Sequence, residues 1–238
     1  MAVTAEHVEE DFPRQEIESA VIRFAGDSGD GMQLTGSQFT LATALQGNDL
    51  ATFPDFPAEI RAPTGTTFGV SAFQINFGSK GIETSGDVLD VLIVMNPAAL
   101  KVNIDDLKPG GLLIADTGAF SSRNLTKAGY SENPLEGDSL EKYKTLEVDM
   151  SRLTKEAVKE HGLTSKEALR CKNMWSLGLI YWMYGRKRKA TVDWLEDKFK
   201  SKPNIAAANI AAINAGHAFG ETAEMPAEVS PYTIPPAE

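Results

Sequence analysis

The sequence is poor in the residues that ligate metals. Its 238 residues include one cysteine, Cys171, so an internal disulfide is impossible and an iron–sulfur cluster, which needs about four thiolates, has no ligand set here. The three histidines, His7, His161 and His217, are scattered without metal-ligand spacing. We therefore expect no metal on this chain and interpret the histidines as surface or helix-end residues.

Long apolar stretches and a surplus of positive charge are also missing. No run of about 18 or more apolar residues occurs, which predicts no transmembrane helix. The acidic N-terminus lacks the basic start and apolar core of a signal peptide. A formal net charge of −10 argues against non-specific binding to nucleic acid or to an anionic membrane. We predict a cytoplasmic protein that binds neither.

The sequence does contain a glycine-rich turn between a strand and a helix. Val21, Ile22 and Phe24 are β-branched or aromatic and predict a buried strand over residues 21–24, and residues 31–46 predict a helix. The predicted site residues of this unit are Gly26, Asp27, Ser28, Gly29, Asp30, Gly31 and Thr35. Glycines allow another group to approach the backbone, and the helix N-terminus presents unpaired N–H groups. Ligands bind at the carboxyl ends of such strands in α/β sheets.

The chemistry of this turn is unlike that of a dinucleotide site. Its spacing is Gly-x-x-Gly-x-Gly, whereas the dinucleotide fingerprint is Gly-x-Gly-x-x-Gly. Asp27 and Asp30 would repel a phosphate by about 1 kcal/mol or more for each pair of charges. The turn therefore suits a neutral or amide-bearing part of a ligand, a metal-bridged phosphate or a partner chain. The alternative interpretation, a tight turn that binds no ligand, also remains open.

A proline-containing segment, residues 54–67, is the second candidate. Its three prolines exclude a helix or a central strand and predict a long loop, and such loops often carry function. The guanidinium of Arg61 and nearby hydroxyls would suit a carboxylate or phosphate. These hydroxyls belong to Thr64, Thr66 and Thr67. Equally, Arg61 could have a structural role and hold the loop in place by pairing with one of the loop's own acidic residues.

Asn96 is a minor candidate. The most apolar run, residues 88–95, predicts a buried parallel strand, and Asn96 follows it directly. With Pro97 behind it, Asn96 is a natural N-cap for a helix, and this structural role is the simpler interpretation. Its place at the carboxyl end of a strand keeps it among the site candidates.

The remaining pattern alternates strands and helices. Further strands are expected at 51–53, 68–77, 112–115 and 145–150, and further helices at 151–160, 173–184 and 203–219. We interpret 117–142 as a surface loop, the basic run 185–189 as a solvated helix end and Thr191 as a helix cap. The alternation predicts an α/β fold with three layers, in which helices flank a mostly parallel, Rossmann-like sheet. We divide the chain into an N-terminal arm (1–20), one domain (21–222) and a Pro-rich linker or arm (223–238).

Taken in order, several motifs resemble the gamma domain of the 2-oxoacid:ferredoxin (or flavodoxin) oxidoreductases. They lie at 26–31, 53–54, 59–61, 88–96, 107–116, 173–178 and 203–216. Ser28 and Asp30 make the turn most similar to the gamma part of the fused gamma/alpha subunit of 2-oxoglutarate enzymes. The Pro-rich tail is similar to the linker into that alpha domain.

The resemblance implies a reaction and a division of labour. The enzyme would convert a 2-oxoacid, coenzyme A and oxidised ferredoxin to acyl-CoA, CO₂ and reduced ferredoxin, reversibly, as in the reductive tricarboxylic acid cycle. 2-Oxoglutarate is the expected substrate, with pyruvate and branched-chain or aryl 2-oxoacids as alternatives. Gly29-Asp30-Gly31 is similar to the start of a thiamine diphosphate signature, but the Asn pair that this signature needs is absent.

Cofactors other than coenzyme A are therefore expected in partner chains. Thiamine diphosphate, Mg²⁺ and [4Fe–4S] clusters would belong to a beta subunit and to an alpha, pyrimidine-binding domain or subunit, with ferredoxin as electron acceptor. This chain would not be catalytic alone, and its candidate residues would face coenzyme A. Two other functions are open: a purely structural subunit that docks the partners, and an independent dinucleotide-binding enzyme. The latter would need a different glycine order and a carboxylate at the end of the second strand.

Overall fold

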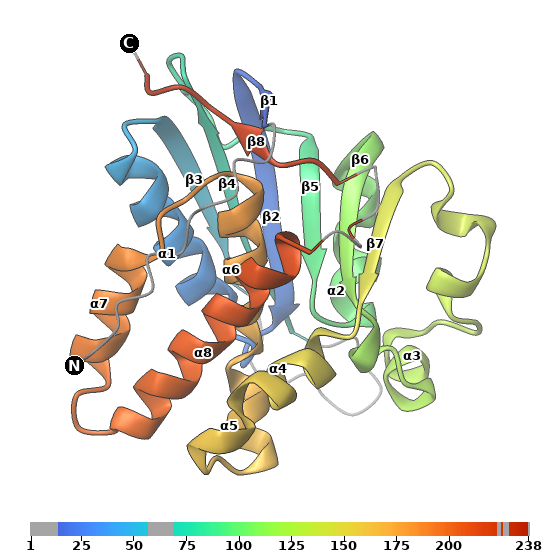
Figure 1. Cartoon of the computed structure of the whole chain (residues 1–238). Coiled ribbons are helices and arrows are strands. Elements are labelled where there is room, and N and C mark those ends of the chain that lie inside the picture. Colours follow the sequence, from blue (N-terminus) through green and yellow to red (C-terminus); the bar gives the residue numbers. More distant parts are fainter. Residues whose placement is uncertain (1–13, 57–68, 223–224, 226–228, 238) are drawn as a thin grey trace.

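The middle layer of the protein is a six-stranded sheet. The computed structural model describes residues 14–56, 69–222, 225 and 229–237. The strands are β2 (Ser19–Asp27), β3 (Asp49–Asp55), β4 (Val70–Gly78), β5 (Leu89–Val94), β6 (Leu107–Asp116) and β7 (Lys144–Val148), in the order β3-β4-β2-β5-β6-β7 (Figure 1). β2, β5, β6 and β7 are parallel, and β4 is antiparallel to both β2 and β3. Helices cover both faces, so the predicted three-layer, mostly parallel α/β fold is confirmed.

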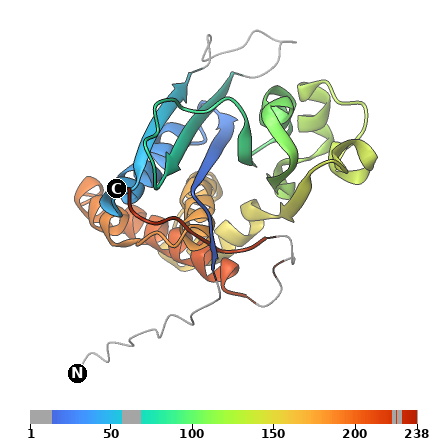
Figure 2. The ribbon, with the colours of Figure 1, turned by 90° about the horizontal axis from the view of Figure 1, so that it is seen from above.

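The two faces of the sheet bury different side chains. α1 (Met32–Leu45), α4 (Met150–Val158), α6 (Lys172–Met183), α7 (Lys189–Lys198) and α8 (Pro203–Gly220) lie on one side; α2 (Pro97–Asn103) and α3 (Ser122–Ala128) lie on the other (Figure 2). Because side chains alternate along a strand, Ile93 joins the core beneath α6. Its neighbours Leu92 and Val94 pack with Leu100 of α2. A strand buried on both faces explains the continuous apolar run in β5.

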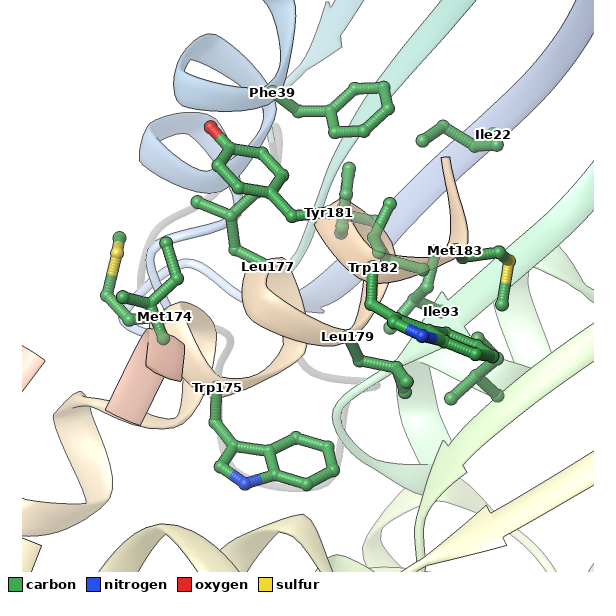
Figure 3. Packing of buried hydrophobic residues seen from close by; sticks show 14 of the residues in the cluster. Ile22, Phe39, Ile93, Met174, Trp175, Leu177, Leu179, Tyr181, Trp182 and Met183 are labelled. Atoms are coloured by element: carbon green, nitrogen blue, oxygen red, sulfur yellow. The ribbon is translucent and has the colours of Figure 1, made fainter. Parts of the chain in front are cut away.

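α6 is the central helix of the larger core. All 12 of its residues are buried, and Figure 3 shows its side chains extending on several sides of the helix. This confirms the helix predicted at 173–184 and places it in the core. Its backbone touches that of α8: a Cβ at Gly178 would lie 2.0 Å from the carbonyl oxygen of Ile213, and one at Gly216 would lie 1.8 Å from that of Trp175. Only glycine permits this approach.

Three predictions in the second half of the chain were wrong. Residues 117–142 are not simply a loop, because they contain α3 with Ser121 as its N-cap; this short helix buries only Ala128 and so shows little apolar period. Arg186 is not solvated but 3% exposed, with its guanidinium over the rings of Phe77 (5.2 Å) and Phe39 (5.9 Å). Thr191 is no cap, because it lies inside α7.

The described parts of the two terminal segments lie together on the body. β8 (Tyr232–Thr233) pairs with β1 (Gln15–Glu16) in a two-stranded parallel sheet. Asn48 donates a hydrogen bond from Nδ2 to the carbonyl of Pro235 (2.6 Å). We call residues 14–17 and 229–237 the clasp. The division of the chain at residues 20 and 222 stays a prediction, although the last part of the tail is an arm packed on the domain.

The remaining α-helix of the described residues is α5 (Ser165–Arg170). It begins with a capping box formed by Thr164 and Glu167, a Thr-x-x-Glu pattern that is visible in the sequence. Gly162 precedes it with a φ of +66° and ends the preceding helical segment, as its position after residues 151–160 predicted. None of the helices in the described part of the chain is long and apolar enough to cross a membrane.

Candidate functional site

The glycine-rich turn lies where the helical connections between strands switch from one face of the sheet to the other. From β2 the chain passes through α1 to β3 on one face, whereas from β5 it passes through α2 to β6 on the other (Figure 1). β2 and β5 are parallel neighbours, so their carboxyl ends bound a topological switch point. Open α/β sheets bind ligands at this position. The fold therefore places the predicted turn, residues 26–31, at the edge where a site is expected.

The turn is held by one of its own carboxylates. Asp30 accepts a hydrogen bond at Oδ2 from the backbone N–H of Asp27 (2.9 Å), and its own N–H donates to the carbonyl of Asp27 (2.9 Å). A Cβ on Gly26 would lie 2.8 Å from that same Oδ2, so a side chain there would displace the Asp30 carboxylate from this hydrogen bond. Gly31 adopts a φ of +78° and begins α1 without a side-chain cap. The carboxylate of Asp30 thus satisfies the N–H of Asp27 and leaves a negative charge beside the turn.

Asn96 joins the ends of β2 and β5. Its Nδ2 donates to Oδ1 of Asp27 (2.8 Å), while its own Oδ1 accepts from the N–H of Ala99 (2.9 Å). It is therefore the N-cap of α2, as predicted, and also a bridge across the switch point. Burial, together with the charge of Asp30, raises the pKa of Asp27. The folded chain holds this proton more tightly than the unfolded chain, so ionisation of Asp27 at neutral pH opposes folding, a feature common at functional sites.

A buried ion pair lies behind the switch point. Lys172 donates from Nζ to Oδ2 of Asp116 (2.8 Å) and to the carbonyl of Met95 (3.3 Å). Ser151 donates to both carboxylate oxygens of Asp116, from its N–H (3.1 Å) and its hydroxyl (2.7 Å). Asp116 is fully buried. This network ties the ends of β5 and β6 to the start of α4. We did not predict it, although a lysine opening an apolar helix and an aspartate ending an apolar strand are visible signals.

Gln33 ties the end of β3 and the start of β4 to α1. Its Nε2 donates to the carbonyls of Asp55 (3.0 Å) and Ala72 (2.8 Å), and the N–H of Ser28 donates to the carbonyl of Gly69 (3.3 Å). The end of β3 and the start of β4 thus lie next to α1. Arg61, Thr64, Thr66 and Thr67 themselves lie outside the described residues.

The other predicted residues differ in accessibility. Ser28 and Gly29 are exposed at the tip of the turn, and a Cβ on Gly29 would meet nothing within 4 Å. Thr35 is fully buried, and its hydroxyl donates to the carbonyl of Gly31 (3.2 Å). The structure therefore places Thr35 beneath the turn, where it braces α1. The outer face offers N–H groups of a helix start beside carboxylates, which suits a neutral carbonyl or amide better than a bare phosphate.

Comparison by sequence and comparison by structure both find a 2-oxoglutarate oxidoreductase among the relatives of this chain. The 2-oxoglutarate oxidoreductase subunit KorA of Mycobacterium tuberculosis (strain ATCC 25618 / H37Rv) is 53% identical over 228 residues, which are 94% of this chain and 35% of the relative. The chain thus spans about a third of the length of that protein. A solved structure with 25% identity and a TM-score of 0.70 is the 2-oxoglutarate:ferredoxin oxidoreductase of Magnetococcus marinus with 2-oxoglutarate, coenzyme A and succinyl-CoA bound; the match covers 94% of this chain and 34% of that one.

Two smaller solved proteins share the fold over most of their length. The gamma subunit of a keto/oxoacid ferredoxin oxidoreductase from Geobacter sulfurreducens PCA matches with a TM-score of 0.52 and 20% identity, covering 84% of this chain and 99% of that one. The pyruvate oxidoreductase subunit PORC from Thermotoga maritima matches with 0.54 and 19%, covering 85% and 97%. The family model described as pyruvate ferredoxin/flavodoxin oxidoreductase matches residues 21–219. The chain therefore belongs to the pyruvate ferredoxin/flavodoxin oxidoreductase family.

Proposed function

We propose that this chain is the gamma domain of a 2-oxoglutarate:ferredoxin oxidoreductase. The enzyme would convert 2-oxoglutarate, coenzyme A and oxidised ferredoxin to succinyl-CoA, CO₂ and reduced ferredoxin, reversibly and in the cytoplasm. The observation that carries the proposal is the 53% identity to a 2-oxoglutarate oxidoreductase subunit over 94% of the chain. The role of the chain is to form one wall of a reaction centre that other chains complete.

The carboxyl edge of β2 and β5 is the proposed coenzyme A-facing wall. Asp27 and Asp30 leave it acidic, so the pyrophosphate of coenzyme A would be repelled there. The amide-bearing arm of the same molecule fits, because the uncapped start of α1 at Gly31 offers N–H donors to carbonyl oxygens. Asn96 and Lys172 hold the strand ends in place. The loop with Arg61, Thr64, Thr66 and Thr67 is proposed to close this wall.

The redox and decarboxylation chemistry would come from partner chains. Thiamine diphosphate with Mg²⁺ supplies the decarboxylation, and [4Fe–4S] clusters carry the electrons to ferredoxin. The one thiol of this chain is a poor cluster ligand, because burial raises the pKa of Cys171 to about 11 and keeps it protonated. Within the described residues, no three histidine, cysteine or acidic side chains gather where they could hold a metal ion. We propose an alpha (pyrimidine-binding) domain and a beta subunit as the partners.

Reconstitution tests the proposed activity. Produced alone, the chain is expected to reduce no ferredoxin with 2-oxoglutarate and coenzyme A; with alpha and beta partners it should form a complex that does, and pyruvate should be a poorer substrate. Ferredoxin reduction followed by absorbance is the measurement. Turnover by the chain alone would contradict the proposal. Full coenzyme A-dependent turnover by a complex without residues 1–222 would assign the chain a purely structural docking role.

A further inference from the structure

A cavity lies at the opposite edge of the sheet from the glycine-rich turn. It occupies about 310 Å³ between the clasp and the amino ends of β2, β5, β6 and β7, within the size range of small-molecule sites. Tyr232 of the clasp and Tyr184, at the end of α6, form its aromatic wall, with ring centroids 5.7 Å apart. Val91 and Leu112 add apolar surface from β5 and β6. The cavity is therefore lined by aromatic and apolar side chains, and the clasp closes it on one side.

The hydroxyl of Tyr184 opens into this cavity. Tyr184 is 3% exposed, and its ring is fixed by edge contacts with Phe77 (5.1 Å) and Phe39 (6.1 Å). Among the described residues, no group accepts from or donates to its hydroxyl. Burial, then the carboxylate of Asp90, raises the pKa of Tyr184, so the hydroxyl remains a donor at neutral pH. The oxygen itself is not fully buried, so the hydroxyl opens into the cavity and can donate a hydrogen bond to an acceptor placed there.

The charges that line the cavity favour an anion. Asp90 has a partner on each oxygen: its Oδ2 accepts from the N–H of Val21 (2.7 Å), and its Oδ1 forms an ion pair with Lys108. Lys144 adds a second ammonium from the start of β7. The residues that line the cavity therefore carry two ammonium groups and one carboxylate, a net charge of +1 in an acidic protein.

We propose that this cavity binds a small organic carboxylate. The carboxylate accepts hydrogen bonds from the Tyr184 hydroxyl and from the ammonium groups of Lys108 and Lys144. The apolar part of the ligand lies against Val91 and Leu112. Because Tyr232 belongs to the clasp, an occupied cavity also holds the clasp against the sheet. This site is independent of the proposed enzymatic function.

Binding of hexanoate to the full chain tests the proposal. Calorimetry should show one saturable site with a Kd of about 1 mM or lower, a reasonable value for a ligand of this size. Hexanamide, which has the same shape without the charge, should bind at least about tenfold more weakly. Hydrogen exchange in residues 229–237 should slow when hexanoate binds. Equal binding of hexanoate and hexanamide, or no saturable binding of hexanoate, would overturn the proposal.

Matched variants locate the site. Lys144→Glu should abolish hexanoate binding, whereas Lys142→Glu, which makes the same charge change two residues away beside the ring of Tyr143, should leave it unchanged. Tyr184→Phe keeps the ring and removes the hydroxyl, and it should weaken binding about tenfold. Both lysines are exposed, so these variants should fold. Equal effects of the two lysine variants would show that binding is non-specific and would overturn the proposal.

Discussion

Gly216→Ala is expected to destabilise the protein by about 3 kcal/mol or more, at the upper end of the range for overpacking. The added Cβ would lie 1.8 Å from the carbonyl oxygen of Trp175 and 3.1 Å from the backbone nitrogen of Leu179. Both contacts are with backbone atoms, so α6 and α8 must move apart rather than change a rotamer. The better helix propensity of alanine, worth about 1 kcal/mol, cannot offset this. Denaturant unfolding is the measurement.

Gly137→Ala is the matched control for this substitution. Gly137 has an extended backbone, with φ −156°, and a Cβ there would meet nothing within 4 Å. Its replacement should therefore change the unfolding midpoint little. If the Gly216→Ala and Gly137→Ala variants had the same unfolding midpoint, the close backbone contact that we describe between α6 and α8 would be contradicted.

Lys172→Met is expected to cost about 3–5 kcal/mol of stability. Methionine has similar length but no charge, so Asp116 would remain fully buried with only Ser151 to donate to it. The carbonyl of Met95 would also lose its ammonium partner. Denaturant unfolding at neutral pH is again the measurement, and a loss below about 1 kcal/mol would show that the pair is not the bridge we describe.

Removing both charges separates the ion pair from simple packing. In Lys172→Met combined with Asp116→Asn, no unpaired charge is left in the core, and Ser151 can still donate to the asparagine oxygen. The double variant should therefore recover much of the loss. An additive loss in the double variant would mean that the two side chains stabilise the fold independently.

The local elements of the fold could be predicted because their signals are local. The apolar run of β5, the Asn96-Pro97 start of α2 and the glycines of the turn each occupy a few consecutive residues. Strand order is not a local property. The segment 68–77 is recognisable as a strand, but nothing in it shows that β4 inserts antiparallel between β2 and β3.

The candidate site was predictable in part for the same reason. The turn and Asn96 are visible because glycine and N-cap residues mark the ends of elements. Lys172 and Arg186 were missed because the meaning of a charged residue depends on distant partners, Asp116 in one case and two aromatic rings in the other. In a basic run such as 185–189, composition favours solvent exposure, and only the folded core reveals that one member is buried.

The topology also bears on the alternative of a dinucleotide-binding enzyme. In that class the strand after the first helix lies beside the first strand, and a carboxylate at its end binds the ribose. Here β4 separates β3 from β2, so the end of β3 lies two strand spacings, about 9.6 Å, from β2. Asp55 ends β3 but is therefore displaced from the turn. The geometry favours the gamma-domain function over this alternative.

The most direct test of the central claim, that the carboxyl edge of β2 and β5 faces coenzyme A, is the KM for coenzyme A of a reconstituted complex carrying Gly29→Trp. The chain itself has room for this side chain, since a Cβ on Gly29 meets nothing within 4 Å. Gly81→Trp is the control, because Gly81 is equally open and follows β4 at the opposite edge of the sheet. We expect the KM to rise at least about tenfold for Gly29→Trp, a change of about 1.4 kcal/mol, and to stay unchanged for Gly81→Trp. An unchanged KM in Gly29→Trp would contradict the claim, and an unchanged KM in Arg61→Ala would remove the adjoining loop from the site.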